Sequence, residues 1–298
     1  MARVISYIID ESFDGLKIGV LLKFRKGYST SLIRSIKTIK NGIMLDNQPV
    51  RTIDVVHTGN ILTVTLPEET SEIEPMECEL DIVYEDDDIL VINKSPFMAM
   101  HPTHNHQGDT LANGVVAHLK NEGKSTVFRA VGRLDKGTSG LVVCALNPLA
   151  ACKLSGKVEK EYYAVVKGNV EEQGTVDTPV YRPDPMKTLR ACSRELGTES
   201  AVTHWTLVKQ YENKALIRLK LETGRTHQIR VHMASIGHPL AGDTYYGDFE
   251  PRHGHQLLHC GKCSLIHPVT DEKMEFVAEF PAEFEKQMNI ITQKCINA

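Results

Sequence analysis

The sequence contains no apolar run long enough to cross a membrane. The longest fully apolar run among the 298 residues is the short stretch 141–146, whereas a membrane-spanning helix needs about 20 apolar residues. The first ten residues also lack the apolar segment and cleavage site of a secretion signal. Seven scattered cysteines are then expected to be reduced thiols. We therefore expect a cytoplasmic protein with no membrane partner.

Positive charge is also scarce, since the formal net charge is −4. That balance argues against a nucleic-acid-binding protein, because phosphate binding needs positive charge. The average hides an asymmetry: residues 1–60 carry nine Lys or Arg and five Asp or Glu, whereas residues 61–90 carry eleven acidic residues and no Lys or Arg. A charge break of this kind marks a domain boundary. The composition, 41% hydrophobic and 24% charged, excludes disorder as the main state.

A helix with a basic face is predicted within the N-terminal block. Ser29 is placed to cap it, and Gly42 to end it. Three apolar residues recur at helical spacing on one face: Leu32, Ile36 and Ile39. Three basic residues lie on the polar face: Arg34, Lys37 and Lys40. The pattern predicts a helix that packs on one side and offers positive charge on the other.

Short strands surround this helix. Residues 43–50 are predicted to form a hairpin, and residues 55–56 to pair with residues 61–64. The acidic segment 67–75 has a proline at each end and no periodicity, so it is interpreted as a linker. We therefore predict a small α/β domain, including the linker, over residues 1–75.

The remainder of the chain alternates β-rich runs with short helices. A hairpin is predicted at 82–92 and a strand pair at 202–221. A helix through Ile229, Met233 and Ile236 is ended by the glycine that follows. Repeating βαβ units are not evident. The pattern predicts an α+β domain over 76–298 with a largely antiparallel mixed sheet flanked by helices and loops.

A polar loop precedes the apolar strand at 141–146. In this loop, residues 132–140, glycines and hydroxyl side chains surround Asp135. A carboxylate held there can lie at the floor of a cleft. The alternative is a turn in which Asp135 and Ser139 cap backbone groups, and from the residue chemistry alone this alternative is favoured.

Two further stretches carry candidate functional residues. Residues 222–233 pass from a glycine turn into a helix, and Arg225 at the turn is placed to reach a carboxylate; the alternative is a solvated helix start. Residues 160–168 read as a strand with Tyr162 and Tyr163 on opposite faces. One tyrosine is expected in the core, and the other is available to contact a ligand.

A group of nitrogen and sulfur donors near the C-terminus suggests a zinc site. Its members are His253, His255, His259, Cys260 and Cys263. A second donor pair at zinc-finger spacing is missing, and the interspersed leucines indicate a strand. We expect no metal.

Three separated motifs resemble those of the RluA-type pseudouridine synthases. They are Arg-Leu-Asp-Lys-Gly-Thr-Ser-Gly at 133–140, Lys-Glu-Tyr at 160–162 and Thr-Gly-Arg-Thr-His-Gln-Ile-Arg-Val-His at 223–232. With weaker similarities on either side, the resemblance covers residues 80 to 280 in the family's order. Three motifs in order are specific, whereas a lone Arg-Leu-Asp is not. One departure is Gly132, where many members have His or Asn.

The N-terminal block resembles, more loosely, the S-four-type RNA-binding domain. In that fold a basic helix face lies on RNA, a role that Arg34, Lys37 and Lys40 would take. The combined resemblance implies an RNA partner, with large-subunit ribosomal RNA favoured and transfer RNA left open. A monomer is expected.

The resemblance also implies roles in the catalytic cleft. Asp135 would attack or stabilise the sugar as uracil leaves, and an ion pair with Arg225 would hold it ionised. Arg133 would enter the gap left by a flipped-out base. Tyr162 would stack on uracil and take part in proton transfer. No cofactor or metal is required for this isomerisation.

Two other functions compete with RNA uridine isomerisation. A catalytically silent RNA-binding or ribosome-assembly factor on the same fold would bind RNA without product. A hydrolase would use Asp135 as a glycosidase-like nucleophile, but this chemistry usually needs a second carboxylate about 5–10 Å away. The three motifs offer no paired acid.

Overall fold

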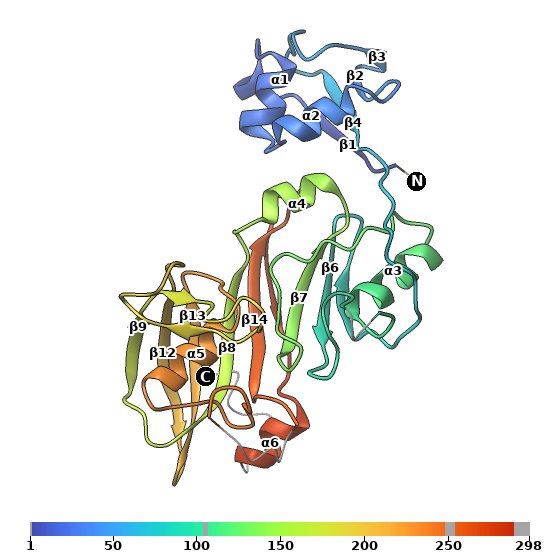
Figure 1. The fold of residues 1–298 in the computed structure, drawn as a ribbon. Coiled ribbons are helices and arrows are strands. Elements are labelled where there is room, and N and C mark those ends of the chain that lie inside the picture. Colours follow the sequence, from blue (N-terminus) through green and yellow to red (C-terminus); the bar gives the residue numbers. More distant parts are fainter. Residues whose placement is uncertain (1, 104–106, 248–253, 289–298) are drawn as a thin grey trace.

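A computed structural model describes residues 2–103, 107–247 and 254–288. They form a four-stranded sheet near the N-terminus, a nine-stranded sheet and a two-stranded ribbon (Figure 1). The small sheet lies beyond one end of the large one, next to helix α4, Pro148–Leu154. None of the described helices is long and apolar enough to span a membrane.

The N-terminal sheet has the strand order β1-β4-β2-β3. Its strands are β1 (Val4–Ile8), β2 (Ile43–Leu45), β3 (Gln48–Pro49) and β4 (Ile61–Thr65). Its helical segments are Glu11–Phe13, α1 (Ile18–Val20), Leu21–Arg25 and α2 (Thr30–Ile36). Apolar side chains from the strands and helices form a second buried core. Leu149 of α4 is buried in it and Val269 packs against it, so this core is shared with the unit that carries the large sheet.

Local signals located the elements of this region, but the predicted helix is too long: α2 ends at Ile36, so Ile39 and Gly42 lie beyond it. Ser29 caps α2, accepting a hydrogen bond from the Leu32 amide at 3.1 Å, and β2 pairs with β3 as the predicted hairpin. The pairing of 55–56 with 61–64 is wrong. Strand β4 pairs instead with β1 and β2, because β1 offers it a five-residue antiparallel register. The predicted pairing joined segments that are close in the sequence, whereas β4 pairs with a strand more than 50 residues before it.

The large sheet follows the order β5-β6-β7-β14-β8-β13-β12-β9, with β15 also paired to β14. Its strands are β5 (Ile82–Glu85), β6 (Ile89–Lys94), β7 (Ser139–Ala145), β8 (Glu159–Lys167), β9 (Gln173–Asp177), β12 (Val202–Gln210), β13 (Lys214–Leu221), β14 (Leu258–Ile266) and β15 (Lys273–Val277). Strand β7 runs parallel to β14, and the other described neighbours are antiparallel. The predicted α+β class, the 82–92 hairpin and the 202–221 strand pair are confirmed.

Helices and a ribbon flank this sheet. The helices are α3 (Leu111–Asn121), α4, α5 (Gln228–Ser235) and α6 (Ala282–Met288). The ribbon pairs β10 (Val180–Tyr181) with β11 (Ala191–Cys192). Gly237 ends α5 as predicted, with a φ of 84° that favours glycine. Thr110 and Asn113 cap α3 reciprocally.

The segment predicted as a linker, 67–75, is docked on the large sheet's unit. The Glu74 carbonyl accepts a hydrogen bond from Asn113 Nδ2 at 2.8 Å, and the Glu69 carbonyl accepts one from Ser125 Oγ at 2.9 Å. Ile73 packs against the main core. The acidic, aperiodic sequence indicated no regular structure, but it did not exclude these specific contacts.

This docking predicts that two N-terminal truncations differ in stability. A chain starting at residue 67 keeps the contacts of Ile73 and Glu74, and a chain starting at residue 76 loses them. We expect the shorter chain to unfold roughly 4–8 °C lower, equivalent to about 2 kcal/mol for a domain of this size. Differential scanning calorimetry of the two chains measures the difference, and equal melting temperatures would show that the segment contributes nothing.

Candidate active site

A cleft of about 760 Å³ opens on one face of the large sheet. Its wall combines the 131–138 loop, the start of β8 and the segment joining β13 to α5. Asp135, Tyr162, Arg133 and Arg225 all line it. The structure therefore brings together four residues that the sequence placed in three separate motifs.

The Asp135 loop is fixed by the strand that follows it. Strand β7 is buried along its whole length, and Gly140 lies directly against the backbone of Cys260 in β14. A Cβ atom at residue 140 would approach the Cys260 carbonyl oxygen to 2.2 Å. Glycine is required here because any side chain would separate β7 from β14. The close approach holds the loop at the floor of the cleft.

Asp135 pairs with Arg230 rather than with Arg225. Arg230 Nη1 donates to Asp135 Oδ2 at 3.2 Å. The Arg225 side chain turns away: its Nε donates to the Ser200 carbonyl at 3.0 Å, and its Nη1 lies 3.8 Å from Glu199. The predicted Asp135–Arg225 ion pair is therefore wrong. Arg225 stays exposed at the cleft wall, where the helix-start alternative had placed it.

Arg230 owes its position to a second carboxylate. Its Nε and Nη2 donate to Asp243 at 2.7 and 2.8 Å, which leaves Nη1 for Asp135. The Arg230 side chain is 6% exposed and that of Asp243 is fully buried. This two-pronged contact is the geometry that arginine supplies and lysine does not. Neither residue was selected from the sequence, where a basic residue on a short helix and an acid shortly after it were the available signal.

Tyr162 and Tyr163 lie on opposite faces of β8, as predicted. Tyr162 faces the cleft, and burial raises the pKa of its hydroxyl well above the usual value. Tyr163 packs edge-on against Phe280 on the other side, at 5.2 Å between ring centroids. The Tyr162 ring is therefore placed to stack on a ligand in the cleft.

A buried lysine supports the loop from below. Lys94 Nζ donates to the carbonyls of Ser95, Met98 and Lys136, at 2.7, 2.8 and 3.3 Å. Burial lowers the pKa of Lys94 to about 7, and the negative charge of Asp135 opposes that shift. Lys94 thus ties the end of β6 to the residue after Asp135. Sequence reasoning did not select it.

The basic candidates lie outside the floor of the cleft. Arg133 is exposed at the cleft wall and hydrogen-bonds to the Thr226 hydroxyl. Arg34, Lys37 and Lys40 are exposed on and just after α2, in the N-terminal unit. All four are accessible to a large ligand.

The donors that suggested zinc do not form a metal site within the described residues. His253 lies outside them. Cys260 and Cys263 are buried in the main core, and the two ring nitrogens of His259 contact Ser139 Oγ and the Ala278 carbonyl. These side chains belong to β14 and its packing, as the interspersed leucines indicated.

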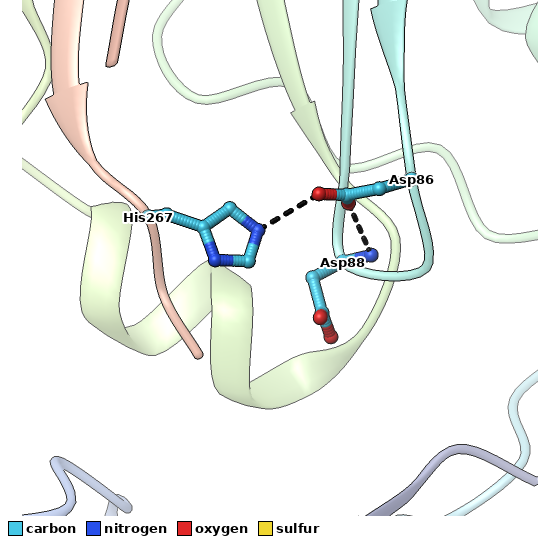
Figure 2. Close-up of side chains that lie close together, drawn as sticks. All are labelled: Asp86, Asp88 and His267. Atoms are coloured by element: carbon cyan, nitrogen blue, oxygen red, sulfur yellow. Dashed lines mark hydrogen bonds and ion pairs between the residues drawn. The ribbon is translucent and has the colours of Figure 1, made fainter. Parts of the chain in front are cut away.

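Another group of possible ligands combines Asp86 and Asp88 of the β5–β6 turn with His267, which follows β14 (Figure 2). His267 Nε2 contacts Asp86 at 2.9 Å, while its Nδ1 accepts the Thr270 amide at 3.0 Å. Asp88 accepts hydrogen bonds from Arg3 and Asn147. These atoms are already engaged within the protein, so the group is structural.

Comparison with known proteins places this geometry in a family. Residues 88–235 match the family model described as RNA pseudouridylate synthase. The chain is 38% identical over 270 residues to an uncharacterized RNA pseudouridine synthase, YjbO, of Bacillus subtilis (strain 168), covering 87% of this chain and 94% of that one. It is 39% identical over 244 residues to ribosomal large subunit pseudouridine synthase D of Haemophilus influenzae (strain ATCC 51907 / DSM 11121 / KW20 / Rd), covering 75% and 74%.

A solved structure supports the same assignment. Human RNA pseudouridylate synthase domain containing 1 aligns with a TM-score of 0.55 and 26% identity, over 72% of this chain and 86% of the human one. The fold and the sequence therefore agree on the family.

The revised ion pair predicts unequal effects of two Arg→Lys substitutions. Arg230→Lys loses aligned charge-assisted bonds to buried carboxylates, each worth on the order of 1.5–3 kcal/mol, so turnover should fall roughly 10- to 150-fold or more. Arg225→Lys keeps an exposed charge and should cost less than about fivefold. Turnover at saturating RNA, with circular dichroism to verify folding, tests this. A larger loss of turnover in Arg225→Lys than in Arg230→Lys would instead support the Asp135–Arg225 ion pair.

Proposed function

Since the chain belongs to the RNA pseudouridylate synthase family, we propose that it isomerises specific uridines in structured RNA through Asp135. The Asp135–Arg230 ion pair on the floor of the cleft carries this proposal. Asp135 is 19% exposed, so its carboxylate is reachable from the cleft while its ion pair is largely shielded from water. Such a group is suited to react with a sugar carbon.

The reaction changes connectivity without changing composition. The bond from N1 of uracil to C1′ of the ribose breaks, and a bond from C5 to C1′ forms. C5 loses its proton and N1 gains one, so no atom or electron is added. Asp135 attacks or stabilises the sugar while the base is detached. Arg230 pairs with the carboxylate and directs it, and no metal or redox step is needed for the balance.

The cleft supplies the other requirements of this reaction. A uridine inside a helix is unreachable, so the base is extruded into the cleft. Tyr162 stacks on the extruded uracil, and the apolar Ile229 and Leu258 of the wall keep water from the detached base. The exposed Arg133 is available to occupy the gap left in the RNA.

Hydrolysis is less well supported than isomerisation. A glycosidase needs a second free carboxylate facing the first. Asp243 is linked to Asp135 through Arg230, but its side chain is fully buried and paired with Arg230. Three glutamates lie on the cleft wall. Glu161 is 3.3 Å from Lys220 and 3.7 Å from Arg218, Glu222 is 2.9 Å from His204, and Glu159 is exposed at the start of β8. A silent binding protein would have no need of the assembled Asp135, Arg230 and Tyr162.

Ribosomal RNA of the large subunit is the substrate that we propose. Relatives from Haemophilus influenzae and Neisseria meningitidis carry that substrate in their names. The exposed basic residues on and just after α2 are suited to bind structured RNA. The enzyme would act as a cytoplasmic monomer. Transfer RNA is the alternative, and the experiment below separates the two.

The function is tested by mapping pseudouridine in cells with and without the gene. We expect specific pseudouridines to disappear from large-subunit ribosomal RNA when the gene is deleted. They should return when the wild-type gene is supplied and not when Asp135→Asn is supplied, because an amide cannot replace an attacking carboxylate. Purified Asp135→Asn should bind RNA normally but release no tritium from 5-labelled uridine.

Other outcomes identify the competing functions. Loss of sites from transfer RNA alone would reassign the substrate. Loss of a base from the RNA, seen by mass, would indicate a hydrolase. Binding without product by the wild-type protein would indicate a silent factor.

The N-terminal basic face predicts a change in the salt dependence of RNA binding. The triple variant Arg34→Ala, Lys37→Ala and Lys40→Ala removes up to three phosphate contacts, so the slope of log K against log salt should decrease by roughly two to three. A control triple variant, Lys120→Ala, Lys273→Ala and Lys286→Ala, removes equal charge from exposed sites elsewhere and should leave the slope near wild type. Equal slopes for both triple variants would show that Arg34, Lys37 and Lys40 do not contact RNA phosphates.

A further inference from the structure

His227 stands beside the Asp135–Arg230 pair in an unusual backbone conformation. It precedes α5 with a φ of 58° and a ψ of 15°, in the left-handed region. This conformation is uncommon for residues other than glycine. Its side chain is 10% exposed, and its Nε2 lies 3.9 Å from Asp135 Oδ2. The conformation turns the imidazole toward the reactive carboxylate.

The other ring nitrogen of His227 contacts a tyrosine hydroxyl. His227 Nδ1 lies 2.8 Å from Tyr246 Oη, and the same oxygen accepts a hydrogen bond from the Arg190 backbone amide at 2.8 Å. An amide N–H can only donate. The Tyr246 proton is therefore free to point elsewhere, and His227 Nδ1 is its acceptor among the described residues.

These contacts determine where the imidazole carries its proton. Burial lowers the pKa of His227 to about 4, with Asp135 opposing the shift and Arg230 adding to it, so the ring is neutral near pH 7. A neutral ring that accepts at Nδ1 carries its proton at Nε2. The Nε2–H group then faces Asp135.

We propose that Tyr246 is a positioning residue that selects the Nε2–H tautomer of His227, so that this group, together with Arg230, orients Asp135. The arrangement rests on the proposed function, because it acts through the Asp135 carboxylate. At 3.9 Å the imidazole makes a directed electrostatic contact rather than a full hydrogen bond. With the opposite tautomer, a lone pair would face the carboxylate and repel it.

The contacts from Tyr246 through His227 to Asp135 form a relay. The Arg190 amide connects this relay to the segment joining β10 to β11. Val180 of β10 and Cys192 of β11 belong to the same small apolar cluster as Ala201, Val231 and Tyr246. The donor is a backbone group, so the relay depends on how the segment is docked and not on the Arg190 side chain. The positions of β11 and the catalytic carboxylate are thus linked through two side chains.

Tyr245 provides a matched comparison for Tyr246. The Arg230 guanidinium lies 5.3 Å from the ring centroid of Tyr245 and 5.2 Å from that of Tyr246. Both rings also contact the His227 ring. Of the two hydroxyls, that of Tyr246 has the contacts with Arg190 and His227. Replacing each tyrosine with phenylalanine therefore keeps the ring contacts and isolates one hydroxyl.

The tautomer is tested directly by nitrogen NMR of the His227 imidazole, which distinguishes a protonated ring nitrogen from an unprotonated one. We expect Nε2–H in the wild-type protein and in Tyr245→Phe, and a mixture of tautomers in Tyr246→Phe. An unchanged spectrum in Tyr246→Phe, or Nδ1–H in the wild-type protein, would overturn the proposal. This measurement needs no substrate, so its outcome is separate from that of the proposed function.

Kinetics test the consequence for Asp135. Tyr246→Phe should lower kcat roughly three- to tenfold more than Tyr245→Phe, with little change in KM, since the loss of one neutral hydrogen bond is expressed at the carboxylate. Equal kcat values for the two variants would overturn the proposal.

Two substitutions of His227 separate its two nitrogens. His227→Gln can place an amide N–H near the Nε2 position, whereas His227→Asn reaches only the Nδ1 position. We expect Gln to retain more turnover than Asn, although Asn suits the left-handed backbone better. Adding Tyr246→Phe to His227→Gln should then cost little more, because the acceptor of the hydroxyl is gone. Additive losses, or higher turnover with Asn, would assign His227 a purely structural role.

Discussion

The Asp135–Arg230–Asp243 chain of charges is the contact on which the candidate site depends. One guanidinium holds two carboxylates, and the two differ in accessibility: Asp243 is fully buried, whereas Asp135 is 19% exposed. Burying charges costs free energy unless each is paired and hydrogen-bonded. Asp243 meets that requirement with two bonds to Arg230. The remaining donor can then hold Asp135 where a ligand can reach it.

The sheet brings this chain together from distant parts of the sequence. Asp135 lies in the loop that leads into β7, and Arg230 lies on α5, which follows β13. The parallel pairing of β7 with β14, adjacent to β8, places the loop beside Tyr162. This pairing requires Gly140, since a side chain would collide with the Cys260 backbone. The structural glycine in β7 thus fixes the end of the short loop that carries the reactive aspartate.

The sequence predicted features that depend on local patterns. Alternating and helical periodicities located the 82–92 hairpin, the β12–β13 pair and α5, and the motifs located Asp135 and Tyr162 on one cleft. Features set by distant contacts were missed. Arg225 and Arg230 are both basic residues of one motif, and the choice between them depends on Asp243, which only the folded chain brings to Arg230. The β1–β4 pairing and the docking of Ile73 were not predicted, because both also depend on contacts between distant parts of the sequence.

The Asp86–Asp88–His267 group is held by contacts that cross the junction between the two units. Asp88 is 3% exposed and is paired with Arg3 from the N-terminal unit; it also bonds Asn147, whose side chain caps α4. Leu149 of α4 packs in the N-terminal core. A desolvated carboxylate needs such partners, and here they come from both sides of a junction. These contacts therefore join the basic N-terminal unit to the unit that carries the cleft. They hold α2 in a fixed position relative to Asp135.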